Sequence, residues 1–513
     1  MSGNVDDVRV VCFGDIGLAE STQHLSPEHI EESARLPQRG KWNRKVLSPW
    51  AKAFEKEKEQ KARQDKLDGK FFIEEPAEFS LTQPGTEIRQ SLEEHVHNYS
   101  STKFNITKIC CQYNHTLMLM LIYVDDGTLY GFGNGSFGKL GNEGTHDESV
   151  PFRVLDEVVD MATGLNHSVA VRADGSVLSW GSSSCGQLGH GSLDDVWLPK
   201  HIAHFMYKNE KPVKVACGDY HTMVLCDSGL IYGFGKTTEG QLDKPMPDTH
   251  ESLPDVPSSE DESARTSSQL LYQCTPKLMK CFEKIPHKNR LLEHYKARRR
   301  FIKFVHVDCG QNFTAALSVA GDLYMCGEGR TGVLCRGTTH VANHKVKIAQ
   351  FTELDQVNSR VIDVQCILKN GQELTPELTF SLTSQIVQPP THNKKFVQIV
   401  CGWGHVMCLA DDQTIYSCGL NLNGQCGTGD KSKVVKLTQV KQPKQLREEG
   451  VASISCGGAF SIITSKLGKS FLLGRFPFSN LDFVEPTHVP ELSLDDIHYL
   501  RCGYRKVVCI QNI

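Results

Sequence analysis

The feature that most constrains the fold of this chain is a repeat within its own sequence. Five stretches each contain a glycine, a His or Phe three residues later, and a second glycine 14 residues after that His or Phe. They are TGLNHSVAVRADGSVLSWG (163–181), CGDYHTMVLCDSGLIYGFG (217–235), CGQNFTAALSVAGDLYMCG (309–327), CGWGHVMCLADDQTIYSCG (401–419) and CGGAFSIITSKLGKSFLLG (456–474). A sixth copy begins with CQYNHTLML and reaches Gly133 with four extra residues. Spacing that is fixed over six copies predicts an architecture of repeated units.

The interior of each copy has the pattern of a β-hairpin. Short runs of alternating or β-branched residues flank turn residues such as Asp174-Gly175 and Ser228-Gly229, without a helical period. A unit of this size cannot bury both faces of its sheet, so neighbouring units must stack on one another. The sequence therefore predicts an all-β fold, a β-propeller.

The closing glycine of each copy is expected to be structural. It stands where a tight turn or a close approach between strands is needed, which favours a residue without a side chain. These repeat glycines are Gly14, Gly133, Gly181, Gly235, Gly327, Gly419 and Gly474. Five copies place a further glycine five residues later, which gives GKLG, GQLG, GQLD, GVLC and GQCG.

The two ends of the chain supply one more unit. Residues 498–513, HYLRCGYRKVVCIQNI, have the pattern of opening strands, and residues 8–20, VRVVCFGDIGLAE, have the pattern of a closing strand. Together they predict one composite blade. With openings at residues 106, 158, 213, 304, 397 and 451, this predicts a seven-bladed β-propeller closed by pairing of the N- and C-terminal strands.

These residues resemble the regulator of chromosome condensation family, whose repeats carry a CGxxHT…G.vy.WG.n..GQLG pattern. The resemblance covers 8–20, most of 104–242, 301–335 and 397–513, and it implies a seven-bladed propeller that both termini often close. It weakens after the last copy, where Phe476-Pro477-Phe478 replaces the second glycine motif.

Three long insertions are expected between the blade segments 8–20, 104–242, 301–335 and 397–497. They are 21–103 (charged and partly helical), 243–300 (acidic, then basic) and 336–396. Residues 361–366 could open a degenerate eighth blade, but Cys366 is followed by Ile367 rather than glycine, which favours an insertion.

The insertions hold the candidate partner-binding residues. Residues 35–70 contain 12 Lys/Arg and five Asp/Glu together with Trp42 and Trp50, and they predict either a solvated helix on the propeller or a docking segment. Residues 243–262 contain seven acids and one base, which is typical of a disordered stretch. Residues 284–303 contain eight Lys/Arg, including Arg298, Arg299 and Arg300. They predict a patch for an import receptor or an anionic surface, unless the acidic stretch neutralises them.

Candidate chemical sites find little support in the sequence. The stretch from Gly133 to Lys139 mimics a phosphate loop, but Leu140 stands where Ser or Thr would bind magnesium. The repeated histidines His115, His167, His221 and His405 could converge on a metal, yet two copies have Phe at the same position, which favours packing. No nucleophile–base–acid set can be assembled from the spacing. The expectation is a chain with no catalytic residues, no metal site and no cofactor.

Composition and charge exclude several classes of protein for this chain. A formal net charge of −4 argues against a general nucleic-acid coat. The start of the chain lacks the pattern of a secretory signal and no apolar run is long enough for a membrane span, so the 19 cysteines are expected to be reduced thiols in a cytoplasmic or nuclear protein.

These observations favour a non-enzymatic scaffold that binds other proteins. The resemblance implies a first alternative, guanine-nucleotide exchange on a small Ran-like GTPase, and a second, a chromatin-associated adaptor. In the best-known member of that family, the exchange wedge is a lengthened loop between the closing glycine and the next glycine. Here that interval is five residues in five copies, so the sequence shows no wedge there.

Overall fold

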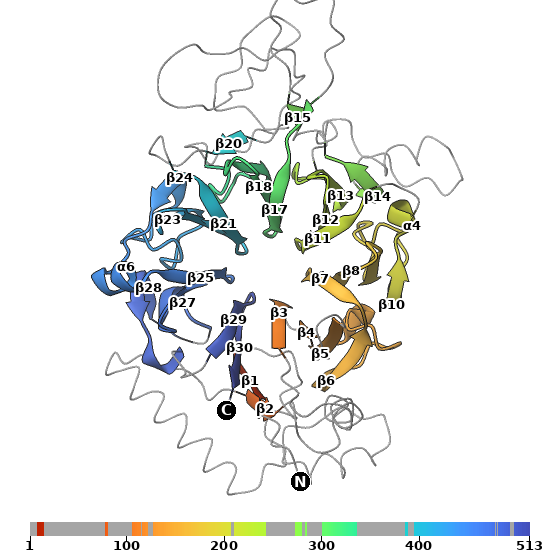
Figure 1. Ribbon diagram of the computed structural model, residues 1–513, viewed down its shortest axis with the longest axis horizontal. Coiled ribbons are helices and arrows are strands. Elements are labelled where there is room, and N and C mark those ends of the chain that lie inside the picture. The colour runs from red at the N-terminus through yellow and green to blue at the C-terminus, as the bar shows by residue number, and fades with distance from the viewer. Residues whose placement is uncertain are drawn as a thin grey trace, which may run out of the picture.

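Four-stranded antiparallel sheets arranged around a central axis form the computed structural model, as Figure 1 shows. The predicted all-β propeller is confirmed. The structure describes residues 8–14, 77–80, 105–113, 115–121, 127–206, 210–242, 272–279, 283–284, 300–335, 385–387, 394–477, 479, 481–492 and 497–512.

Six of the sheets follow one another along the chain, and we number them blades 1 to 6. In each blade the first strand is the innermost and the fourth is the outermost. Blade 1 contains β3 (Asn105–Gln112), β4 (His115–Leu121), β5 (Thr128–Gly133) and β6 (Glu148–Leu155). Blade 2 contains β7 (Val158–Thr163), β8 (His167–Arg172), β9 (Val177–Gly181) and β10 (Val196–His201). Blade 3 contains β11 (Pro212–Cys217), β12 (His221–Cys226), β13 (Ile231–Lys236) and β14 (Tyr272–Leu278). Blade 4 contains β17 (Phe304–Cys309), β18 (Phe313–Ser318), β19 (Leu323–Gly327) and β20 (Gln385–Val387). Blade 5 contains β21 (Phe396–Cys401), β22 (His405–Ala410), β23 (Ile415–Gly419) and β24 (Val434–Gln439). Blade 6 contains β25 (Val451–Cys456), β26 (Phe460–Ser465), β27 (Ser470–Arg475) and β28 (Asp482–His488).

A further four-stranded sheet, which we call the terminal blade, joins the two ends of the chain. Its order is β2 (Ala77–Ser80), β1 (Val8–Gly14), β30 (Lys506–Asn512) and β29 (Ile497–Cys502). Strand β1 pairs antiparallel with β30, from Val8 opposite Asn512 to Gly14 opposite Lys506. The first strands contact one another in the order β3, β7, β11, β17, β21, β25 and β29, and β29 contacts β3.

Short elements connect the blades. They are the helices α4 (Ala203–Met206) and α6 (Lys444–Glu449), the 3₁₀ turns η1 (Ser136–Gly138) and η4 (Pro490–Leu492), and the paired strands β15 (Glu283–Lys284) and β16 (Arg300–Phe301). Among the described helices, none has the length and apolar character needed to cross a membrane.

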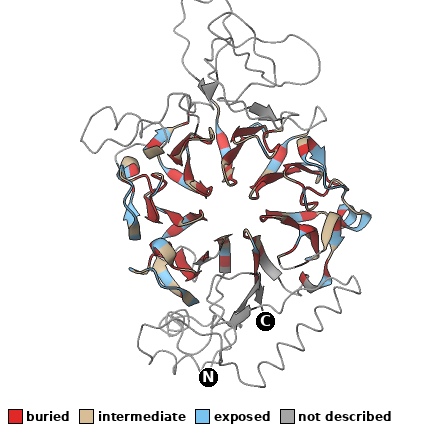
Figure 2. Ribbon diagram, turned by 180° about the vertical axis from the view of Figure 1, so that it is seen from behind, coloured by how far each residue is buried: buried red, intermediate tan, exposed pale blue. Residues whose placement is uncertain are grey.

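The hydrophobic core lies between neighbouring blades, because both faces of each sheet are covered. Between blades 2 and 3, for example, Val169 and Val171 pack in one cluster with Val215 and Val224. Figure 2 shows the consequence: buried residues follow the inner strands, and exposed residues gather at the rim. The second and third strands are therefore mostly buried, as in β8 and β9, whereas an outer strand such as β10 is mostly exposed.

The expected insertions 21–103, 243–300 and 336–396 are too wide. Each contains the outer strand of a blade, namely β2, β14 and β20. These strands are the fourth of their sheets and carry none of the repeat glycines, so the motif does not mark them. The three longest connections that remain, 15–76, 237–271 and 328–384, all join the third strand of a blade to its fourth.

The expectation that the cysteines are thiols is wrong at one pair. Cys335, in the connection between β19 and β20 of blade 4, and Cys418, in β23 of blade 5, form a disulfide across 83 residues of sequence. The stacking of the two blades brings them together, which no local spacing could indicate. Fourteen further cysteines among the described residues carry thiols rather than disulfides.

Candidate interaction face

One end of the ring carries two sets of loops from every blade. Because the strands of a blade are antiparallel, the loop between strands one and two lies at the same end as the connection between strands three and four. We call this end the loop face. It bears the Gly-x-x-His loops near the axis and the connections 15–76, 237–271 and 328–384 toward the rim.

The first loops are locked to one another around the axis. The residue after each motif glycine donates its backbone N–H to a carbonyl oxygen of the next blade. The bonds are Leu165 to Asp219 (3.3 Å), Asp219 to Gln311 (3.2 Å), Gln311 to Trp403 (3.1 Å) and Trp403 to Gly457 (3.1 Å), followed by Gly458 to Tyr504 (3.0 Å). The motif glycines are required here by close approach: a Cβ on Gly218 would lie 2.6 Å from the carbonyl oxygen of Gly310.

Side chains from these loops meet over the axis in a group that we call the axial cluster: Tyr113, Asp219, Gln311, Trp403 and Tyr504. The Tyr113 hydroxyl contacts both carboxylate oxygens of Asp219, at 3.1 and 3.0 Å. The rings of Tyr113 and Tyr504 stack with centroids 4.6 Å apart, and Trp403 lies 5.9 Å from Tyr504. The cluster thus connects blades 1, 3, 4 and 5 and the terminal blade.

The acid of the axial cluster is shielded from water. Asp219 is 6% exposed, and burial raises its pKa to about 6 although Tyr113 and Gln311 donate hydrogen bonds to it. Burial also raises the pKa of the Tyr113 hydroxyl, which therefore stays protonated as a donor. The three aromatic rings are half-buried, so the loop face presents aromatic surface around a sheltered carboxyl group.

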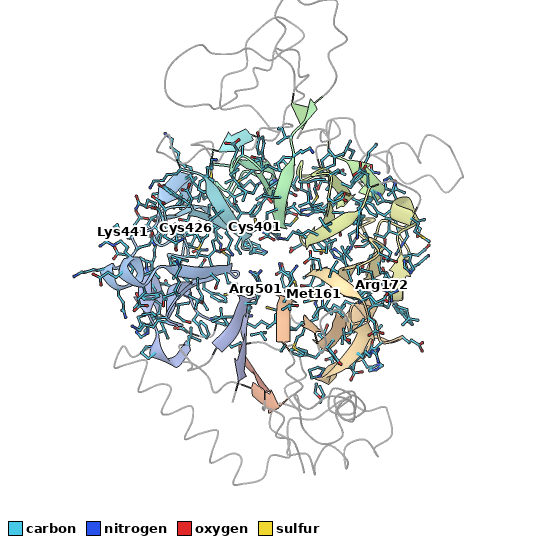
Figure 3. The ribbon with its side chains drawn as sticks, viewed as in Figure 1. Met161, Arg172, Cys401, Cys426, Lys441 and Arg501 are labelled. Atoms are coloured by element: carbon cyan, nitrogen blue, oxygen red, sulfur yellow. A yellow bond between two sulfur atoms is a disulfide. The ribbon has the colours of Figure 1, made fainter. Side chains whose placement is uncertain are left out.

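Polar side chains of the first strands join neighbouring blades below this cluster. Asp160 receives a bond from the Lys108 ammonium at 2.5 Å with one oxygen and from the Val215 N–H at 2.8 Å with the other. Lys214 donates to Nδ1 of His306 at 2.6 Å. Burial, followed by the Lys214 charge, lowers the pKa of His306 to about 3, so its ring is neutral and can accept this bond. Figure 3 shows Met161, Cys401 and Arg501 next to the axis, with Arg172 and Lys441 toward the rim.

The four repeated histidines bridge blades and do not converge. Each is 0% exposed, and its Nε2 contacts a hydroxyl of the next blade. The pairs are His115–Ser168 (3.3 Å), His167–Thr222 (3.0 Å), His221–Thr314 (3.1 Å) and His405–Ser461 (2.7 Å). Each hydroxyl donates its own proton to a backbone carbonyl, of Lys139, Gln187, Gln241 or Gln425. The histidine Nε2 must therefore be the donor in each pair.

Burial keeps these histidines neutral, since it lowers the pKa of His167 and of His221 to about 3. Where Phe replaces His, the partner changes as well: Phe313 packs in one cluster with Val406, and Phe460 packs in another with Val507. The position is thus a blade-to-blade contact that is either polar on both sides or apolar on both. No set of three or more His, Cys, Asp or Glu side chains among the described residues could hold a metal ion.

In the loop that mimics a phosphate site, the lysine side chain is buried and does not point into the loop. Lys139 is 2% exposed, and its Nζ donates to Oδ1 of Asn166 in the next blade at 3.3 Å. Burial lowers the pKa of this lysine to about 8.

Family models match the repeat directly. One model, described as the regulator of chromosome condensation (RCC1) repeat, matches residues 126–171, 174–225 and 412–463. A second model of the same description matches 158–187, 213–241 and 396–425. The chain is an RCC1-repeat propeller.

Two known proteins are similar in sequence to this RCC1-repeat propeller, and one solved structure shares its fold. It is 27% identical over 362 residues to the ultraviolet-B receptor UVR8 of Arabidopsis thaliana, covering 67% of this chain and 72% of that protein. It is 25% identical over 345 residues to the protein RCC2 homolog of Xenopus laevis, covering 67% of this chain and 55% of that protein. The crystal structure of Prp20p from Saccharomyces cerevisiae shares the fold, with a TM-score of 0.56 and 16% identity over 99% of this chain and 93% of that one.

The closing glycines of the RCC1 repeats have a left-handed backbone. Their φ angles are 106° at Gly133, 105° at Gly181, 111° at Gly235, 120° at Gly327, 113° at Gly419 and 82° at Gly474. A Cβ on Gly181 would lie 2.5 Å from the carbonyl oxygen of Asn166. This geometry supports the structural role that we propose for these residues. Gly14 ends β1 of the terminal blade.

Of the predicted partner-binding residues, the structure describes the backbone of Arg300 alone. Trp42, Trp50, Arg298 and Arg299 lie outside the described residues. Arg300 begins β16, in the connection from blade 3 to blade 4, which belongs to the face opposite the loop face.

The sequence did not predict two of the contact surfaces. The axial cluster is one, although its members share a signal, the position after the motif glycine or its equivalent. The other lies at the rim, where Phe137, Trp197 and Leu198 are 47%, 50% and 45% exposed. Strand β10 contacts η1 there, and Trp197 lies so close to Gly138 that a Cβ on this glycine would be 2.6 Å from the indole.

Proposed function

We propose that this RCC1-repeat propeller is a non-enzymatic scaffold that binds other proteins through its loop face. One observation carries the proposal: the three longest connections leave the ring at this face, around the aromatic axial cluster. A rigid frame that presents loops on one side is a common basis for protein recognition. The half-buried rings of Tyr113, Trp403 and Tyr504 add the residue types that are enriched at protein interfaces.

Affinity purification followed by mass spectrometry tests the scaffold. The full chain is compared with two variants in which 243–271 or 336–384 is replaced by the short connection 190–195 of blade 2. The control variant lacks 285–299, which belongs to the opposite face. Loss of partners from the first two variants and their retention by the control is expected. Loss only from the control would contradict binding through the loop face, and would favour the basic segment 284–303 and an import receptor or anionic surface.

Nucleotide exchange on a small Ran-like GTPase is the second candidate. The fold shared with Prp20p favours it, because Prp20p itself has binding properties to Gsp1p and histones. In this chain the five-residue interval between the paired glycines holds no wedge, so any wedge would have to come from a long connection. A Ran-type GTPase loaded with fluorescent nucleotide should release it with little or no acceleration. A hundredfold acceleration, about 2.7 kcal/mol of differential stabilisation, would replace the scaffold by an exchange factor.

The terminal blade has a proposed role of its own, as the closure of a seven-bladed ring. The antiparallel register of β1 with β30 and the contact of β29 with β3 support this role. As a further part of the proposal, the scaffold resides in the cytoplasm, the nucleus or both, with the basic segment 284–303 as the element that would direct import.

A further inference from the structure

The disulfide between Cys335 and Cys418 occupies two positions of the RCC1 repeat. The first position is the last residue of the GQLG motif, which is Gly141, Gly189 and Gly427 in blades 1, 2 and 5. These glycines have φ angles of 83°, 74° and 64°. In blade 4 the residue is Cys335, and it keeps a φ of 60° despite its side chain. A residue with a Cβ is strained in this conformation.

The second position explains why glycine is used elsewhere. It is the residue before the closing glycine of the next blade. At the three junctions where the first position is glycine, this residue has a large side chain. A Cβ on Gly141 would lie 3.1 Å from the indole nitrogen of Trp180, and one on Gly189 would lie 2.9 Å from the ring of Phe234. A Cβ on Gly427 would collide with Leu473. The glycine therefore makes room for the large side chain.

Both positions change together between blades 4 and 5. The glycine becomes Cys335 and the large side chain becomes Cys418, so that two sulfur atoms fill the space of one ring. The two sequence differences complement each other at one contact. This is an observation separate from the disulfide bond itself. Cys326, at the same position of blade 4, shows the contrast, since it is buried and free.

We propose that Cys335 and Cys418 form a reversible oxidation site that fastens the start of the connection 328–384 to blade 5. In the forward direction, hydrogen peroxide oxidises the Cys335 thiolate to a sulfenic acid, and water leaves after protonation. The Cys418 thiol then attacks that sulfur, which forms the disulfide and releases a second water. Two thiols and one peroxide thus give one disulfide and two waters. In the reverse direction, a dithiol reduces the bond by thiol–disulfide exchange and becomes a disulfide itself.

The exposure of the two sulfurs gives the order of attack. Cys335 is partly exposed, whereas Cys418 is 0% exposed. Oxidants and dithiols reach the former first. Other cysteines of the same blades, such as Cys408 and Cys426, are fully buried, and burial raises the pKa of their thiols. They are consequently less reactive, because the thiolate is the nucleophile that attacks the peroxide oxygen.

Reduction should loosen the start of the connection. Without the bond, only non-covalent contacts hold Cys335 in its left-handed conformation. The preceding turn, whose Gly332 N–H bonds to the Gly329 carbonyl at 2.9 Å, then opens more often, and protease reaches the bond after Arg330. This inference is independent of what the loop face binds.

The test uses the purified full chain in three forms: wild type, C335G/C418F and C326S. The double variant restores the glycine–aromatic pair found between blades 2 and 3, so it should fold without the disulfide. C326S removes a buried cysteine from the same repeat position and leaves the proposed site intact. After treatment with peroxide or dithiothreitol, differential alkylation and mass spectrometry measure the Cys335–Cys418 peptide, and timed trypsin digestion measures cleavage after Arg330.

The linked peptide should dominate after peroxide and disappear after dithiothreitol, in wild type and in C326S. Cleavage after Arg330 should be several-fold faster in the reduced state of these two proteins and unchanged by redox state in C335G/C418F. Two thiols that stay unlinked while the partly exposed Cys185 and Cys274 oxidise would overturn the site. Equal cleavage rates in both redox states of wild type would overturn the fastening role.

Discussion

The hydroxyl of Tyr113 in blade 1 donates across the axis to the carboxylate of Asp219 in blade 3, with blade 2 between them. The oxygens lie 3.1 and 3.0 Å from the hydroxyl. The bond connects two blades that are not neighbours in sequence order, on the face from which the longest connections leave. The free energy of unfolding and the pKa of Asp219 both depend on this pair and can be measured.

Stability should depend on pH through Asp219. Burial raises its pKa from 3.8 to about 6, so the folded chain binds an extra proton between these pH values. The contribution of Asp219 to the free energy of unfolding therefore falls as the pH rises from about 4 to 6 and remains lower above pH 6. Asp219→Asn should raise the free energy of unfolding at pH 8 by up to about 3 kcal/mol, and by less at pH 5. Urea unfolding at both values checks this, with the exposed Asp227→Asn as control; a gain that is equal at both pH values would contradict it.

Tyr113→Phe should raise the pKa of Asp219 further, because the hydroxyl stabilises the carboxylate. Titration of the carboxyl carbon of Asp219 by NMR measures the shift. An unchanged pKa would show that the bond across the axis does not form in solution.

The histidine contacts should tolerate a paired exchange but not a single one. Thr314→Val leaves the buried Nε2–H of His221 without an acceptor, at a cost of about 1–3 kcal/mol in the free energy of unfolding. Adding His221→Phe reproduces the apolar pair Phe313–Val406 and should recover most of the loss. A double-mutant cycle by chemical unfolding measures the coupling, and strictly additive effects would contradict the paired contact.

The closing glycines should not accept a side chain. Gly181→Val, Gly235→Val and Gly419→Val should each lower the free energy of unfolding by more than about 1 kcal/mol, because φ is positive and a backbone carbonyl lies in the path of the Cβ. Gly468→Ala is the control: its φ is 80°, but nothing lies within 4 Å of the added Cβ. Wild-type stability of the three valine variants in thermal unfolding would argue against the repeat alignment.

Removal of the N-terminal strand should cause self-association. Deleting residues 1–17 takes away β1 and leaves the edge of β30 unpaired, which favours pairing with a second chain. Deleting residues 1–7 keeps β1 and serves as control. Light scattering coupled to size exclusion gives the masses; a monomer with an unchanged melting temperature would refute closure by the termini.

The sequence predicts what is local and repeated. The hairpins appear because alternating residues and turn glycines recur at fixed distances, and the inner strands begin within a residue of the expected openings. The outer strands β2, β14 and β20 carry no such signal, since each lies beyond the repeat glycines and follows a long connection. Tyr113 and Asp219 are 106 residues apart, so only the closed ring shows that they meet. The same holds for Cys335 and Cys418, whose positions in the motif differ.

The place where the long connections leave the ring gives the fold an unusual tolerance for added length. Blades 1, 2 and 5 bridge strands three and four with residues 134–147, 182–195 and 420–433, whereas blade 4 uses 328–384. Closing a loop costs only about 0.6 kcal/mol for each doubling of its length, so the longer connection destabilises blade 4 by little more than about 1 kcal/mol. The short connections of blades 1, 2 and 5 are therefore sites at which a whole folded domain could be grafted after the glycine motif, and a chain built in this way could carry several such domains on one side.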